Sequence, residues 1–126
     1  MNYDNLPIYK SALNLCIYAE SIVKTFDKYN KYTIGEDLRV YSKNILFLIH
    51  KANRHKQIDT RKKVLNMLVE KCEEFKMLIQ LSKELKVFKT FKSFEYISKL
   101  VINVAKQSQA WFNYTSNNKN PVRVSR

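Results

Sequence analysis

Apolar residues recur at alternating intervals of three and four residues in four separate stretches of this 126-residue chain. Such spacing places the apolar side chains along one stripe of an α-helix, which is buried against other helices. Each stretch covers about 20 residues, and the short links between them favour antiparallel neighbours. We therefore expect an all-α fold, an antiparallel up-down-up-down four-helix bundle within residues 1–114. Residues 115–126 lack the period and end basic, which predicts a disordered tail.

The first two stripes carry signals for where their helices start. The first stripe follows Pro7, a residue favoured in the first turn of a helix, and continues to Phe26. The polar run after Phe26 predicts a loop. Thr33 and Glu36 then have the spacing of a capping box, so the second helix is expected to start there and to continue to Ala52.

The last two stripes are preceded by residues that could cap a helix. The third stripe spans residues 65–85, with Asp59 or Thr60 as its expected cap. The fourth spans residues 94–111, with Ser93 as its expected cap. With these two stripes, the sequence predicts four helices of similar length.

Glycine is nearly absent, since Gly35 is the only one in the chain, and there are only two prolines. Tight β-hairpin turns depend on residues that readily adopt positive φ, glycine above all. The composition therefore argues against a β-rich fold.

The charge is strongly positive, with 23 Lys and Arg against 11 Asp and Glu and a formal net charge of +12. Such an excess repels itself, and an anionic partner would relieve the repulsion, so nucleic acid is the first candidate. The alternative is that the charge serves solubility alone.

No apolar run approaches the roughly 18 residues of a membrane span, and the start of the chain does not resemble a signal peptide. We expect a cytoplasmic protein that does not bind membranes.

Residues suited to acid–base catalysis are few. The two histidines are His50 and His55. A family of helical ribonucleases carries an arginine, four to six further residues and then a histidine. Here Arg54 directly precedes His55, and ten residues separate Arg39 from His50. The motif is absent, so we expect solvated histidines and a protein that is not an enzyme.

A metal site is not expected either. Glu70, Glu73 and Glu74 cluster in the third stripe, but two-metal carboxylate bundles also need a Glu-x-x-His pair and carboxylates from other helices. Lysines stand among the three glutamates, which is typical of a mixed solvated face. Cys16 and Cys72 fall in different apolar stripes, as reduced core residues do. The sequence thus predicts no metal and no cofactor.

The lysines fall in rows when placed on helices. If Phe94 takes heptad position a, then Lys92, Lys99 and Lys106 all take position f, opposite the core. Rows of lysine suit the phosphate backbone of a nucleic acid and do not read bases, whereas a merely solvated face is the alternative. The third helix adds three lysines on one edge and a basic run at its start, and a basic connection follows it. The candidate nucleic-acid-binding residues are Arg61, Lys62, Lys63, Lys76, Lys83, Lys86, Lys92, Lys99 and Lys106.

Most aromatic residues fall on the core stripes. Four others lie in expected loops, namely Tyr29, Tyr32, Phe88 and Phe91. We expect these rings to be exposed and to contact another subunit or a partner.

Several short segments occur in a distinctive order. Leu-Pro-Ile-Tyr at 6–9 is followed by Phe-Asp-Lys at 26–28 and Tyr-Thr-Ile-Gly at 32–35. The third helix carries Leu-Ile-Gln-Leu-Ser-Lys-Glu-Leu-Lys at 78–86, and the fourth ends with Val-Ala-Lys-Gln-Ser-Gln-Ala-Trp at 104–111. Together they resemble the small bundle family that includes the accessory variability determinant of diversity-generating retroelements. The proteins encoded in ribosomal-RNA intervening sequences are more distant relatives of that family.

The resemblance implies a homopentameric barrel of bundles that binds RNA, DNA and an associated reverse transcriptase, without catalysis of its own. Its implied role is to hold template RNA and the reverse transcriptase together during mutagenic copying. Gln80 departs from the family pattern, which usually has an arginine there. Two alternatives remain open: a protein-binding scaffold, and an intervening-sequence bundle protein of unknown role.

Overall fold

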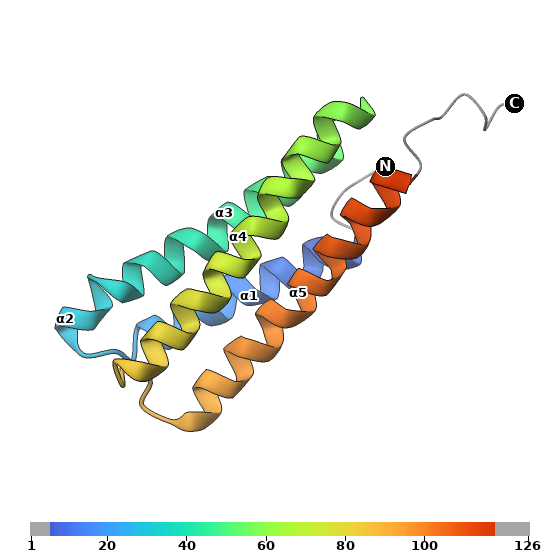
Figure 1. Cartoon of the computed structure of the whole chain (residues 1–126). Coiled ribbons are helices and arrows are strands. Elements are labelled where there is room, and N and C mark those ends of the chain that lie inside the picture. Colours follow the sequence, from blue (N-terminus) through green and yellow to red (C-terminus); the bar gives the residue numbers. More distant parts are fainter. Residues whose placement is uncertain (1–5, 118–126) are drawn as a thin grey trace, which may run out of the picture.

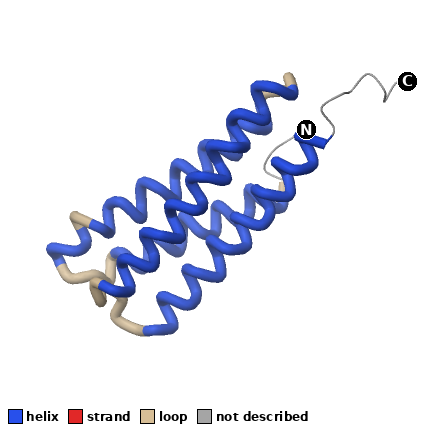
Figure 2. Tube along the Cα trace, in the orientation of Figure 1, coloured by secondary structure: helices blue, strands red, loops and turns tan. Residues whose placement is uncertain are grey.

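A computed structural model describes residues 6–117 of the chain, and these residues form helices and short links without any strand (Figures 1 and 2). The prediction of an all-α fold with four long helices is therefore confirmed. A single-turn helix, α2, accompanies the long ones. The helices are α1 (Pro7–Val23), α2 (Lys28–Lys31), α3 (Ile34–Arg54), α4 (Ile58–Glu84) and α5 (Phe91–Asn117).

Each long helix packs against two others. Helix α1 lies beside α3 and α5, and α4 lies beside the same two helices on the other side of the core. Figure 1 shows α2 and the α4–α5 link at one end of the molecule and the α3–α4 link at the other. Near the start of α1, the Ser11 hydroxyl accepts hydrogen bonds from Asn103 and Gln107 of α5. Further along α1, Tyr18 packs against Tyr96. This arrangement is compatible with a helical bundle.

The core consists of the apolar stripes that the sequence predicts. Phe75 of α4 is fully buried, together with leucine, isoleucine and valine side chains from all four long helices. Two serines in the stripes, Ser82 and Ser108, are buried as well, and each donates its hydroxyl to a carbonyl one turn earlier in its own helix. Small hydroxyl side chains fit a core when their own helix satisfies them in this way.

The start of α1 agrees with the sequence, since Pro7 is its first residue. The capping box expected at α3 does not form. Thr33 does precede α3, but its hydroxyl donates to the carbonyl of Tyr29 at 2.8 Å instead of accepting from the helix. That oxygen belongs to α2, a turn that the sequence analysis treated as a loop.

The other two expected caps are also wrong. Helix α4 begins at Ile58, so Asp59 and Thr60 lie inside its first turn. Helix α5 begins at Phe91, and Ser93 lies within it. The Ser93 backbone N–H instead donates to the hydroxyl of Thr90 at 3.2 Å, which is the bond that a capping residue accepts.

Helix α4 ends in a Schellman motif. The Val87 N–H donates to the Ser82 carbonyl at 3.1 Å, and the Lys86 N–H donates to the Lys83 carbonyl at 2.9 Å. Lys86 takes the left-handed conformation, with φ of 60°, which glycine usually supplies at this position. Val87 is thereby turned into the core.

The expected boundary between bundle and tail moves. Helix α5 continues to Asn117, and Thr115 on its last turn is buried. The remainder of the expected tail, residues 118–126, lies outside the described residues.

Three of the four aromatic residues expected to be exposed are so. Tyr29 in α2, Tyr32 directly after it and Phe91 at the start of α5 are all more than half exposed. Phe88 is half-buried, contrary to expectation. Its ring lies 5.6 Å from that of Phe26, edge to face, so it closes the end of the core.

Candidate nucleic-acid interface

The α5 lysines form the clearest basic row. Lys92, Lys99 and Lys106 are spaced seven residues apart and all three are exposed. The side of α5 that faces the core is occupied by other residues, among them Ile97 and Val104. None of the ion pairs found among residues 6–117 involves these three lysines. Their side chains are therefore exposed to solvent and are not held by an ion pair.

The lysines along the edge of α4 are more engaged. The Lys76 ammonium lies 2.8 Å from the Glu73 carboxylate, and the Lys83 ammonium lies 5.1 Å from the centre of the Phe94 ring on α5. Such exposed ion pairs hold a side chain only weakly. Lys76 and Lys83 can still meet a phosphate, but each must give up a contact to do so.

The basic run at the start of α4 is divided by the helix. Arg61 turns inward, where its Nε donates to the Ala52 carbonyl at 2.9 Å and its Nη2 to the Asn53 carbonyl at 3.3 Å. The guanidinium also lies 5.8 Å from the centre of the Trp111 ring. Arg61 therefore joins the end of α3 to α4 and α5, and this placement argues against the phosphate contact expected of it.

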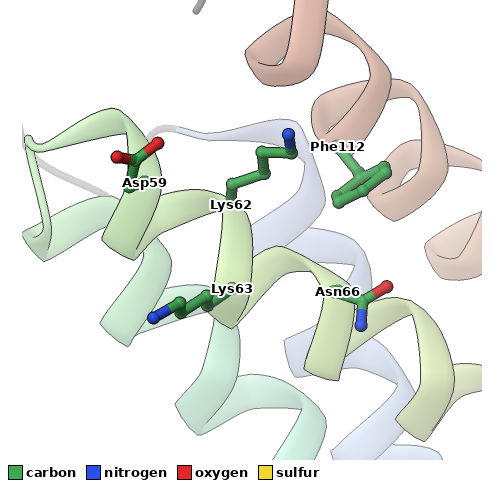
Figure 3. Close-up of a pocket in the computed structure, with 5 residues that line it drawn as sticks. All are labelled: Asp59, Lys62, Lys63, Asn66 and Phe112. Carbon is green, nitrogen blue, oxygen red and sulfur yellow. The ribbon is translucent and has the colours of Figure 1, made fainter.

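The next two residues of the run diverge. Lys62 and Lys63 line a hollow of about 410 Å³ between α4 and α5, together with Asp59, Asn66 and Phe112. Figure 3 shows the Lys62 ammonium directed toward the helix that bears Phe112, whereas Lys63 points away from that helix. Lys62 is half-buried and Lys63 is exposed. Successive residues are about 100° apart around a helix, so a run of three basic residues cannot form one surface.

Lys86 is exposed, but its first role is in the backbone. It supplies the left-handed residue of the Schellman motif at the end of α4. Its ammonium makes none of the ion pairs found within residues 6–117, and the residue lies in the link between α4 and α5, six residues before Lys92.

A basic group that was not predicted from the sequence lies at the opposite end of the molecule. Lys51, Arg54, His55 and Lys56 are all exposed around the α3–α4 link, which also leads to Lys63. Asp59 is the only acidic residue between positions 51 and 63. The sequence carried a signal for this group, an excess of positive charge across the end of the expected second helix. Cations near the C-terminal end of a helix are also stabilised by the helix dipole.

A second missed feature is an aromatic pair beside the α5 row. Tyr18 of α1 and Tyr96 of α5 have ring centres 4.7 Å apart at an angle of 80°. They line a hollow of about 410 Å³ that Lys92 and Lys99 also line. The spacing of Lys92, Tyr96 and Lys99, four and then three residues, could have shown that they share one face.

The residues considered for catalysis or metal binding do not converge. Glu73 and Glu74 pair with neighbouring lysines of α4 and are exposed. Among residues 6–117, no three His, Cys, Asp or Glu side chains come together as a metal site. His55 is exposed as expected, whereas His50 is half-buried.

Both cysteines lie in the bundle as expected for core thiols, with Cys72 fully buried and Cys16 half-buried. Burial raises the pKa of the Cys72 thiol to about 11, and it also raises the pKa of Cys16. The thiolate is the reactive form of cysteine. At neutral pH both side chains are therefore protonated and act as small core residues.

The fold and the charged rows define a small, all-helical, strongly basic protein. Within residues 6–117, no helix is both long enough and apolar enough to cross a lipid bilayer. No protein-family model matches the chain, and a search of curated proteins finds no significant match.

Proposed function

We propose that this protein is a non-enzymatic, nucleic-acid-binding accessory protein of a diversity-generating retroelement. In this role an antiparallel up-down-up-down bundle, assembled as a homopentamer, binds template RNA or DNA and the reverse transcriptase in the cytoplasm. Support for the antiparallel order comes from neighbouring pairs. Arg39 near the start of α3 bonds to Glu20 near the end of α1, and Lys83 near the end of α4 lies over Phe94 near the start of α5.

The observation that carries the proposal is the α5 row of Lys92, Lys99 and Lys106. Three exposed cations, without an acidic partner in the described part of the chain, stand on one helical face. Concentrating like charge is unfavourable for the isolated protein, and phosphates would offset that repulsion. Lysine contacts to phosphate position a nucleic acid without reading its sequence. This suits an accessory protein that holds a template strand during copying without reading its bases.

Nucleic-acid binding is tested by a filter-binding titration at several salt concentrations. Affinity should fall with a log–log slope of about −0.7 for each phosphate neutralised on a single strand. Exchanging Lys92, Lys99 and Lys106 for glutamine should weaken binding to unrelated sequences alike and make that slope shallower by up to about 2.

The matched control is a second triple variant in which Lys24, Lys28 and Lys43 become glutamine. These lysines are exposed on other parts of the bundle, so net charge falls equally without touching the α5 row. An equal effect from both triple variants would mean that the row has no special role. If the parent protein binds neither RNA nor DNA at low salt, the proposal of nucleic-acid binding fails.

The reverse-transcriptase part of the proposal has its own test. The gene should stand beside a reverse-transcriptase gene and a pair of template and variable repeats, and the two proteins should purify together when produced in one cell. Absence of both would leave a bundle that binds nucleic acid in another setting.

A second candidate function, a protein-binding scaffold, is favoured by one surface. Tyr29, Tyr32, Leu81 and Leu85 are exposed around an open hollow of about 580 Å³ beside α2. Exposed aromatic and aliphatic side chains in one place are typical of protein contacts. In the first proposal this surface serves subunits or the reverse transcriptase. In the scaffold alternative it is the main site of the molecule.

A further inference from the structure

We infer that the groove between α1 and α5 takes an unpaired nucleobase, stacked on the ring of Tyr96, while the adjoining phosphates lie on Lys92 and Lys99. The inference rests on the proposed binding of nucleic acid and adds a preference that a row of lysines alone does not give. Backbone contacts act on any strand, whereas a stacking ring acts only on a base that is free to leave its neighbours.

The Tyr96 ring is both exposed and held in place. About half of the residue, 49%, remains accessible to solvent. The half-buried Tyr18 meets this ring edge to face, with ring centres 4.7 Å apart and an interplanar angle of 80°. This geometry is favourable for two aromatic rings and restricts the Tyr96 side chain. A ring that is already fixed loses little further freedom when a base stacks on it.

The charges around the ring match a nucleotide. Lys92 precedes Tyr96 by four residues and Lys99 follows it by three, so the two cations flank the ring on one face of α5. Seven residues correspond to roughly 10 Å along the helix axis, which leaves room for a base between the two lysines. The hollow of about 410 Å³ that these residues line is of the size that holds small organic ligands.

Two further polar groups line the hollow. Glu95 is the only carboxylate among the residues that line it, and it is exposed. It follows Lys92 by three residues and precedes Lys99 by four, so it stands beside the two lysines on the same face of α5 and lowers the positive charge there. Ser93, also in the lining, shares a hydrogen bond of 2.9 Å with Thr90, the residue before the first turn of α5.

Duplexes are poor ligands for such a groove. Their bases are stacked on each other and paired, so a ring can reach a base face only after unstacking. In a single strand each base presents a face to an aromatic side chain, and the stacking tolerates any sequence. The expected ligand is therefore single-stranded RNA or DNA of no particular sequence.

The test measures the affinity of the protein for two fluorescent probes by anisotropy. One probe is a 20-nucleotide oligo-dT, and the other is an abasic oligonucleotide of the same length and charge. The parent protein should bind oligo-dT more tightly than the abasic strand. Tyr96→Leu should weaken binding to oligo-dT by about 5-fold to 100-fold and leave binding to the abasic strand unchanged. The slope of affinity against salt should not change, since no phosphate contact is lost.

Two further variants complete the design. Tyr96→Phe keeps the ring and should bind both probes as the parent does. Tyr114→Leu is the matched control, because it makes the same change at another exposed ring of α5, 18 residues from Tyr96 and outside the groove. Tyr114→Leu should leave both affinities unchanged.

Three results would overturn the inference: a parent protein without preference for oligo-dT, a Tyr96→Leu variant that keeps the preference, or equal weakening on both probes, which would make Tyr96 a structural residue. Failure of the proposed function looks different. In that case the parent binds neither probe even at low salt.

Discussion

At the scale of single residues, Lys86 combines a backbone role with a charge. Its φ of 60° is the only positive φ among the described residues, glycine included. The left-handed conformation costs a residue with a side chain about 1–2 kcal/mol, and glycine avoids that cost but gains freedom in the unfolded chain. Lys86→Gly should therefore raise the free energy of unfolding by about 0.5–1 kcal/mol in urea denaturation. Lys86→Ala removes the same charge without relieving the backbone, so a gain from alanine would show that charge is the cause.

For single residues, the sequence was sufficient to predict exposure where exposure depends only on which face of a helix the residue occupies. The heptad position of Phe94 placed Lys92, Lys99 and Lys106 away from the core, and the structure has all three exposed. The sequence was insufficient to predict side-chain contacts that depend on how the helices pack together. Nothing near Arg61 in the sequence shows that the carbonyls at the end of α3 will lie within reach of its guanidinium.

At the scale of helices, Arg61 is expected to act as a clamp on the end of α3. The last carbonyls of a helix lack partners within it, and Arg61 satisfies those of Ala52 and Asn53 while lying over Trp111. Arg61→Gln should lower the free energy of unfolding by about 1–3 kcal/mol, because hydrogen bonds from a charged group are lost. Urea denaturation measures this change.

The neighbouring Lys63 is the control for Arg61, since it is exposed and makes no ion pair found in residues 6–117. Lys63→Gln should leave the unfolding free energy within about 0.5 kcal/mol of the parent value. If Arg61→Gln instead proves as stable as the parent and weakens nucleic-acid binding, then Arg61 contacts phosphate as the sequence suggested, and its assignment as a clamp is wrong.

The helices were predictable from the sequence because buried apolar residues recur with the period of a helix. The residues that cap the helix ends were not predictable in this way. Four apolar stripes and the start at Pro7 were sufficient to place the core residues of α1, α3, α4 and α5. Caps depend on which hydroxyl happens to face which backbone group. Thr33 has the right residue type and spacing, yet α2 supplies a carbonyl that its hydroxyl bonds instead. A single turn such as α2 has too few residues to show a period.

At the scale of the whole molecule, the two kinds of exposed side chain are distributed differently. The lysine row lies on α5, whereas α4 exposes Met77, Leu81 and Leu85 at intervals of four residues. Helix α3 exposes Val40 and Phe47, seven residues apart, so each of these helices carries an apolar strip on its outer side. The core is complete without them. Apolar strips left at the surface are typical of contacts between proteins.

These strips support the proposed homopentamer, which is tested by the mass of the protein in solution. Burying the α3 and α4 strips between subunits would remove apolar surface from water and would leave the α5 lysines on the outside of the assembly. The family resemblance implies five subunits, so light scattering at micromolar concentration should give a mass near five subunits. Met77→Lys together with Leu81→Lys should shift the mass toward one subunit, because each would place an unpaired charge in the contact. Leu13→Lys together with Ile17→Lys is the control. These two apolar side chains of α1 are also exposed but lie outside both strips, so this change should leave the mass unchanged. A parent protein that scatters as a monomer would contradict self-association, and a stable assembly of another size would contradict the pentamer alone.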